Sequence, residues 1–200
     1  MHSPETRTDI PHTEVFRELS TATKAILDRI PEKTIPEIAR VLCSARDIYV
    51  LGVGHSGFLS RTLSMKLNHI GLRAYTVFDE INPPFGRDSV LVGVSQSGET
   101  TTVVALAEKA CRLGGSVLAF TGNRNSTLGR CAANVVELPV DHIDMQLNAF
   151  RTLGDLKNQN VRGAFFGSAL YSLFYSVTIT AARIRGEDSE SINSRHANLE

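Results

Sequence analysis

Short apolar runs alternate with helical patterns over residues 47–139, and this alternation constrains the fold more than any other feature of the sequence. Strands joined by helices of this length pair in parallel, and the helices cover both faces of the sheet. We therefore predict one α/β domain built on a five-stranded parallel sheet flanked by helices. The predicted strands are residues 47–53, 73–78, 89–94, 116–121 and 134–139, and the predicted helices between them are residues 58–70, 102–113 and 126–131.

The third predicted strand leads into residues 95–102, which read SQSGETTT. A strand-to-helix turn presents unpaired backbone N–H groups and the positive end of a helix dipole, and hydroxyl groups add further donors. Five of these residues are Ser or Thr, whereas an N-cap needs only one or two. The pattern therefore favours phosphate binding over the alternative of capping alone. The expected phosphate contacts are Ser95, Gln96, Ser97 and Thr100.

The first predicted strand leads into a similar turn, Gly54-His55-Ser56-Gly57. In an open parallel sheet, such turns meet beyond the carboxyl ends of the strands, where the strand order reverses. We therefore expect Gly54, His55 and Ser56 to join the second turn in one phosphate-binding pocket.

A dinucleotide site is the alternative for this region, because Gly52, Gly54 and Gly57 also satisfy the G-x-G-x-x-G pattern. Glu80 then stands where a ribose-binding acid is expected. A dinucleotide site has no need of a second turn rich in hydroxyl groups. The pair of turns therefore favours a small phosphorylated ligand.

Composition excludes several classes of function. The 21 basic residues balance the 21 acidic ones, so the chain lacks the positive field of a typical nucleic-acid-binding protein. Cys43, Cys111 and Cys131 form no C-x-x-C pair and no metal-ligand spacing with histidine, so we expect small core residues and no metal site. The sequence has no run of about 18 apolar residues and no signal-peptide pattern, which predicts a cytoplasmic protein.

The chain divides into three predicted segments. Residues 163–185 are strongly apolar with polar interruptions, which is typical of a buried helix that covers the sheet or forms a subunit interface. The segments are an N-terminal helical segment over residues 1–46, with helices at 14–30 and 31–45 that pack on the domain; the domain itself over residues 47–185; and a polar C-terminal tail over residues 186–200.

The two turns carry a family resemblance. Residues 52–57 resemble the first loop of the sugar isomerase (SIS) domain family, and residues 94–100 resemble its second loop. The resemblance extends from about Asp47 to the last residue and implies a flavodoxin-like three-layer sandwich. Within the family the chain is similar to the 6-phospho-3-hexuloisomerases, through the histidine-containing stretch 65–71, the acid-then-proline pair Glu80 and Pro83, and the ending 195–200.

The resemblance implies reversible conversion of D-arabino-3-hexulose 6-phosphate to fructose 6-phosphate. It also implies a homotetramer that uses no metal or redox cofactor and binds a small sugar phosphate, with neither nucleic acid nor membrane as a partner. A base removes a proton from C2 or C3, an enediol forms across these carbons, and an acid returns the proton to the neighbouring carbon. Glu80 follows a predicted strand at the sheet end that carries both turns, so we expect it to be the base. His69 and His196 are then expected to open the sugar ring and return the proton.

Two positions depart from the family pattern. Gly167 stands where the family usually places a glutamate in a G-x-x-F-E stretch, and His55 stands where relatives commonly have arginine or lysine. Either the base is supplied elsewhere, or the substrate differs, or the chain binds without turnover. The alternatives to a hexulose phosphate isomerase are therefore a non-catalytic sugar-phosphate-binding protein and an isomerase of a different phosphosugar.

Alternatives to a catalytic role exist for Glu99 and His69, and His142 is a weaker candidate. Glu99 lies close to a helix start, so we expect a capping or dipole role rather than that of a base. For His69, in the last turn of a helix, a favourable interaction of the charged imidazole with the dipole is the alternative to catalysis. His142 follows the last predicted strand, and no motif supports a role for it.

Overall fold

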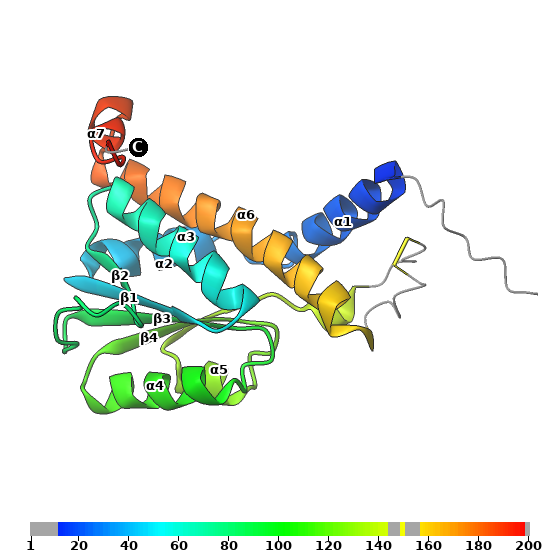
Figure 1. Ribbon diagram of the computed structural model, residues 1–200, viewed down its shortest axis with the longest axis horizontal. Helices are drawn as coiled ribbons and strands as arrows, with labels where there is room; N and C mark the ends of the chain where they lie inside the picture. The colour runs from blue at the N-terminus through cyan, green and yellow to red at the C-terminus, as the bar shows by residue number, and fades with distance from the viewer. Residues whose placement is uncertain (1–11, 144–148, 151–156, 199–200) are drawn as a thin grey trace, which may run out of the picture.

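The computed structural model describes residues 12–143, 149–150 and 157–198, and its centre is a five-stranded parallel sheet with the strand order β2-β1-β3-β4-β5 (Figure 1). The predicted α/β architecture is confirmed. β1 and β3 are buried along their whole length, as expected for strands covered by helices on both faces. The strands are β1 (Asp47–Gly52), β2 (Ala74–Thr76), β3 (Ser89–Ser95), β4 (Ser116–Thr121) and β5 (Asn134–Glu137).

The strand order reverses beside β1. The chain passes from β1 to the edge strand β2 and then crosses back to β3 on the other side of β1. Gly52 and Val94 pair near the carboxyl ends of β1 and β3, so the turns after these strands leave the sheet side by side. Open α/β sheets bind their ligands at this kind of position.

Helices cover both faces of the sheet (Figure 1). Side chains along β1 alternate between the two faces, so that Val50 belongs to the core beneath α3 and α6, and Leu51 to the core beneath α4. One side carries α1 (His12–Leu27), α2 (Thr34–Ser44), α3 (His55–His69) and α6 (Gln159–Arg185), and the other carries α4 (Thr101–Arg112) and α5 (Thr127–Cys131). A short 3-10 helix (Val140–His142) follows β5, and α7 (Ser189–Asn193) follows α6.

α6 is the central helix of the larger core. It is long and apolar enough, by length and composition, to cross a membrane. Its buried face packs instead against α1, α2 and α3, as in a core helix of a soluble protein. Phe174 of α6 meets Phe120 of β4 edge-on, with ring centroids 5.3 Å apart. Burying such aromatic pairs ties the helix to the sheet.

Two helices near the carboxyl end of the sheet, α3 and α6, begin three or four residues earlier than predicted. α3 begins at His55 rather than at residue 58, so the residues of the predicted turn form the first turn of the helix. α6 begins at Gln159 rather than at residue 163, because the Asn158 side chain accepts a hydrogen bond from Asn160 N and caps the helix there. Both changes move helix N-termini toward the carboxyl end of the sheet.

The C-terminal tail contains more structure than its polar composition indicates. Residues 189–193 form α7, where Asp188 and Ser191 make a capping box. The Glu187 carboxylate accepts a hydrogen bond from Arg195 Nη1 at 2.6 Å, which holds the end of the tail beside α7. Residues 1–11 of the predicted N-terminal segment and residues 199–200 of the tail lie outside the described residues.

Candidate functional site

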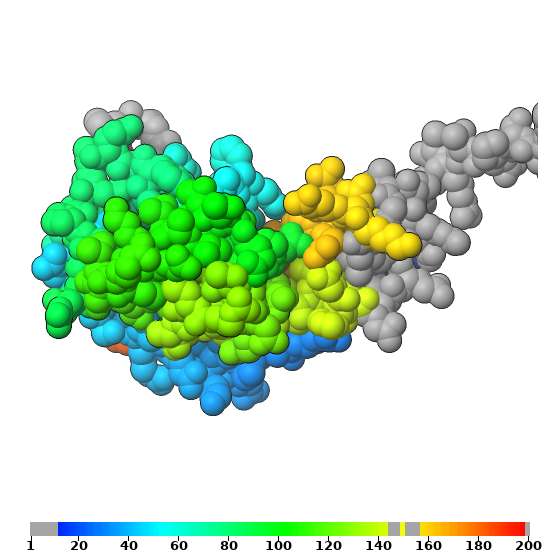
Figure 2. Space-filling model, turned by 90° about the horizontal axis from the view of Figure 1, so that it is seen from below, coloured from blue at the N-terminus to red at the C-terminus, as the bar shows by residue number. Residues whose placement is uncertain are grey.

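Three helices, α3, α4 and α6, begin around one pocket of about 850 Å³. Figure 2 shows the surface hollowed between the start of α3, in cyan, and the start of α6, in yellow and orange. Helix N-termini present unpaired N–H groups and positive dipole ends, so three of them together favour an anionic ligand. The lining residues are Val53, Gly54, His55, Ser56, Gln96, Ser97, Thr100, Lys157, Gln159, Asn160, Arg162, Gly163, Ala164 and Phe166.

Hydrogen bonds within the turn after β3 fix its shape. Ser95 Oγ lies 2.8 Å from Thr100 Oγ1 and accepts a hydrogen bond from Gly98 N at 3.0 Å. Gly98 has a φ of +69°, and a Cβ at this position would collide with Ser126 Oγ, so only glycine fits. The turn is therefore a preformed structure rather than a flexible loop.

This turn brings three of its four predicted phosphate contacts to the pocket. Gln96, Ser97 and Thr100 line it, and the exposed Ser97 hydroxyl accepts a hydrogen bond from Glu99 N at 3.1 Å. Ser95 is only 2% exposed and does not line the pocket. Its hydroxyl supports the turn from beneath.

The turn after β1 brings all three of its predicted residues, Gly54, His55 and Ser56, to the same pocket. Gly54 precedes α3 with a φ of +60°, a conformation that favours glycine. His55 and Ser56 lie in the first turn of α3, where the backbone N–H groups have no partner within the helix. The first turn therefore offers backbone donors as well as side chains.

The imidazole of His55 lies against α6. A Cβ built on Gly167 would come within 2.5 Å of His55 Cε1 and 3.1 Å of Nε2, and a Cβ on Gly163 would lie 3.9 Å from Nδ1. Since real Cβ atoms essentially never come closer than 3.0 Å, any larger residue at position 167 would displace the ring. The two positions that depart from the family pattern are thus in contact with each other.

The start of α6 and the residues just before it add polar and charged groups that sequence reasoning missed. Lys157 and Arg162 are the two permanent cations among the described lining residues. Arg162 Nη2 lies 2.7 Å from Asp141 Oδ2, which orients the guanidinium group. The sequence predicts a helix only from residue 163, so these polar residues fall before its predicted start. The available signal was the run Asn158-Gln159-Asn160 between two cations.

Glu99 has a structural role in the described chain. Its Oε1 accepts a hydrogen bond from Thr127 N at 2.8 Å, at the start of α5, and this bond lowers the pKa of Glu99 below its ordinary value. The carboxylate thus stabilises α5 rather than α4, the helix nearest to it in sequence. Glu99 does not line the pocket.

His69 and His196 contact each other at the opposite end of α3. Their ring centroids are 3.9 Å apart, and Arg195 Nη1 donates to His69 O at 3.2 Å. α3 has 15 residues, so about 20 Å of helix separates His69 from His55 at the pocket. Within one chain neither His69 nor His196 lines the pocket. Their catalytic roles stay predictions.

Burial lowers the pKa of His69, and the neighbouring His196 and Lys66 lower it further. The charged imidazole is therefore disfavoured at this position. Burial and these neighbours thus oppose the favourable interaction of a charged His69 ring with the helix dipole, which is the alternative to catalysis.

Glu80 is exposed in the segment after the edge strand β2 and does not line the pocket. The neighbouring Asp79 carboxylate lies 3.9 Å from Arg61 Nη2 on α3. This segment is separated from the pocket because β2 is at the edge of the sheet, whereas the pocket lies beyond β1 and β3. The role of Glu80 as a base also stays a prediction.

The cysteines and His142 lie outside the pocket. Cys43 is partly buried in the larger core, as expected. Cys111 is exposed, so the expectation that it is a core residue is wrong. Its Sγ lies 3.3 Å from Cys131 Sγ, and both cysteines are free thiols. Burial raises the pKa of Cys131 to about 12. His142 is exposed on the short 3-10 helix.

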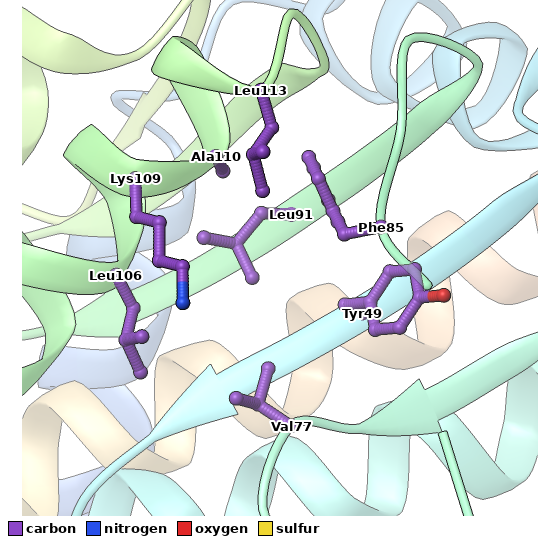
Figure 3. A pocket seen from close by; sticks show the side chains of 8 residues that line it. All are labelled: Tyr49, Val77, Phe85, Leu91, Leu106, Lys109, Ala110 and Leu113. Carbon is purple, nitrogen blue, oxygen red and sulfur yellow. The ribbon is translucent and has the colours of Figure 1, made fainter. Parts of the chain in front are cut away.

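A second cavity of about 250 Å³ lies between α4 and the sheet (Figure 3). Apolar and aromatic side chains such as Leu91, Leu106 and Phe85 point into it, and Lys109 is the one charged residue among those shown. The Tyr49 hydroxyl donates to Pro83 O at 2.8 Å and is thus engaged elsewhere. Such walls offer few partners for a phosphate, so the pocket at the helix N-termini is the candidate site.

Comparisons with known proteins agree with this geometry. The family model of the SIS domain matches residues 41–153. The 3-hexulose-6-phosphate isomerase of Bacillus subtilis is 29% identical over 86% of this chain and 89% of its own length. An uncharacterized protein of Archaeoglobus fulgidus is 38% identical over 54% of this chain and 60% of its own length. The crystal structure of a hypothetical protein, 28% identical, superposes with a TM-score of 0.83 over 94% of this chain and 98% of its own.

Proposed function

We propose, since the chain belongs to the SIS domain family, that it is a sugar-phosphate isomerase and interconverts D-arabino-3-hexulose 6-phosphate and fructose 6-phosphate. The pocket where three helices begin is the observation that carries this proposal. The relative from Bacillus subtilis that bears the name 3-hexulose-6-phosphate isomerase supports the choice of substrate. Both substrates are small phosphorylated ketoses, and the proposal includes a cytoplasmic location with neither nucleic acid nor a membrane as a partner.

The phosphate is held by the two turns. Ser97 and Thr100 donate hydroxyl hydrogen bonds, the first turn of α3 donates backbone N–H groups beside Gly54 and Ser56, and Gln96 completes the contact. Hydrogen bonds to a charged phosphate are stronger than neutral ones. The preformed turn therefore anchors the substrate without a large ordering cost.

Cations lie on the α6 side of the same pocket, at Lys157 and Arg162. A pocket of about 850 Å³ has room for a six-carbon chain beside the phosphate. The sugar thus extends from the turns toward α6. There the cations stabilise negative charge that develops on a carbonyl oxygen during enediol formation.

A second copy of the chain is needed to bring three of the expected catalytic residues to the pocket, namely Glu80, His69 and His196. Large apolar side chains are exposed on α3 and after β2, including Phe58 at 75% and Ile81 at 88%. Exposed apolar side chains on one side of a domain favour association. We propose a homotetramer in which a neighbouring copy brings these three residues toward the pocket.

The alternative is a non-catalytic sugar-phosphate sensor. The absence of an acidic residue among the described residues that line the pocket favours this alternative, since a carboxylate is a common base for proton transfer. A different phosphosugar as substrate is the other open choice.

Conversion of substrate tests the proposed function. Purified protein is incubated with fructose 6-phosphate, and the mixture is followed by phosphorus NMR. We expect a second ketose 6-phosphate to appear and to reach a constant ratio with fructose 6-phosphate. Binding without any conversion, for fructose 6-phosphate and for other ketose 6-phosphates, would instead establish the sensor.

A further inference from the structure

One imidazole side chain, that of His55, lines the pocket. Among the described residues that line it, the charged or titratable ones are His55, Lys157 and Arg162. Lysine and arginine side chains are cations near neutral pH, whereas an imidazole can act as a general base and a general acid. A nearby carboxylate, Asp141, is held 2.7 Å from Arg162 Nη2. The isomerisation needs a group that removes and returns a proton, and His55 is suited to this task.

The position of the His55 ring is set by its contacts with α6 rather than by the turn after β3. The ring stands at the start of α3 and reaches across to α6, where the missing side chain of Gly167 leaves the space that Cε1 and Nε2 occupy. A Cβ on Gly167 would also lie 3.3 Å from Leu59 Cδ1, so the space is enclosed on two sides. Nε2 is enclosed in this space, whereas Nδ1 lies 3.9 Å from the Cβ position of Gly163, which itself lines the pocket. Nδ1 is therefore the ring nitrogen that faces a substrate in the pocket.

We infer that His55 is the catalytic base of this pocket and that Gly167 is a positioning residue that makes room for its ring. This inference rests on the proposed function. It changes the expected role of His55 from a phosphate contact to a contact with the sugar. It also gives His55 the role of base that the sequence analysis expected for Glu80. Ser97, Thr100 and the N-terminus of α3 remain as the phosphate contacts.

The proton transfer balances without any other reactant. The imidazole removes the proton on C3 of fructose 6-phosphate, and the electron pair of that C–H bond forms the C2=C3 double bond while the carbonyl π pair moves to O2. The proton on O3 passes to O2, and the imidazolium returns its proton to C2. A C–H bond is thereby made at C2 and a carbonyl at C3, with no oxidant or reductant involved.

The test separates catalysis from binding. We would measure kcat with fructose 6-phosphate and, separately, the affinity for sorbitol 6-phosphate, which has no carbonyl and does not isomerise. His55→Gln is expected to lower kcat by about 10² to 10⁴-fold, with affinity for sorbitol 6-phosphate changed by less than about threefold. His142→Gln, the same substitution outside the pocket, is expected to change neither quantity.

Two further variants test the positions around the ring. Free imidazole added to His55→Ala is expected to restore part of the lost kcat, which a purely structural role would not allow. Gly167→Ala is expected to lower kcat more than it raises KM, because the displaced ring no longer reaches the carbon. Unchanged melting temperatures and circular dichroism show that each variant is folded.

Several results would overturn the inference. One is a full kcat in His55→Gln. A second is a loss of sorbitol 6-phosphate affinity in His55→Gln while its kcat is retained. A third is a loss of kcat in Asp141→Asn while His55→Gln stays active. These outcomes differ from failure of the proposed function. In that case the wild-type protein itself converts no ketose 6-phosphate.

Discussion

The His55 imidazole occupies the space that a side chain at position 167 would fill, with Cε1 only 2.5 Å from the Cβ position of Gly167. These residues come from the first turn of α3 and from the interior of α6, far apart in the sequence. In the sequence, each was a separate departure from the pattern of the SIS domain family. The contact indicates that the two departures are a single change, in which one residue makes room for the other.

A double substitution tests this coupling. Gly167→Glu alone is expected to be inactive, because the new side chain collides with the His55 ring. His55→Lys alone loses the base. The combined variant carries the residue types that the family resemblance places at both positions, so its kcat is expected to exceed that of either single variant by at least about tenfold. Rates that simply multiply the two single losses would show that the positions act independently.

The turn after β3 is proposed to bind the phosphate, so removing its hydroxyl groups is expected to lower the affinity for a sugar phosphate. Ser97→Ala combined with Thr100→Ala removes two hydroxyl groups from the pocket, and binding of sorbitol 6-phosphate is expected to weaken by about 1.5 to 3 kcal/mol. Isothermal titration calorimetry measures the change. Ser44→Ala, at the exposed end of α2 and outside the pocket, serves as the control. Equal affinities in the folded variant and the wild type would place the phosphate elsewhere.

Subunit complementation tests the proposed second copy. His55→Gln and His196→Ala chains are each expected to be nearly inactive if a site combines His55 of one chain with His196 of another. Unfolding and refolding them together at equal amounts should then return activity to about a quarter of the sites, because random association gives that share both intact residues. The same experiment with Glu80→Gln in place of His196→Ala tests Glu80. Full activity of His196→Ala or Glu80→Gln alone would remove that residue from the reaction.

The lowered pKa of His69 predicts a pH dependence of stability. The groups that face its ring are His196, in the segment after α7, and Lys66, one turn earlier in α3. Between the lowered folded pKa and the ordinary value, the unfolded chain binds more protons than the folded one, so stability rises with pH across this window and falls as pH decreases.

Urea midpoints measured at a series of pH values below neutrality reveal this effect. The wild type and His142→Gln should both show a midpoint that rises with pH. His69→Gln should show a shallower rise, because the group that titrates is absent. Identical slopes in all three proteins would assign the pH dependence to other residues.

The sheet and its two turns were predictable because they depend on local patterns. Short apolar strands, glycine-containing turns and helical spacing are each read within a few residues, and the parallel pairing follows from their alternation. β2 is shorter than predicted because its register with β1 ends at Thr76, a limit that only strand pairing reveals. The position of α7 was missed because its capping box lies within a polar segment.

The pocket could be predicted only in part. Its two turns follow neighbouring strands, but Arg162 comes from α6 and Lys157 from just before it. The place of α6 over the turns is decided by packing rather than by sequence spacing. The contact of His55 with Gly167 is of the same kind. Glu80 was expected at the site because it follows a strand at the correct end of the sheet, yet that strand lies at the edge.

Hydrogen exchange at carbon tests the central claim most directly. The wild-type protein is incubated with fructose 6-phosphate in deuterated water, and the sugar is examined by proton and carbon NMR. The account predicts deuterium at C3 of fructose 6-phosphate and at C2 of the product, with the rate greatly reduced in His55→Gln. Saturable binding of fructose 6-phosphate with neither conversion to a second ketose phosphate nor deuterium at any carbon would contradict it.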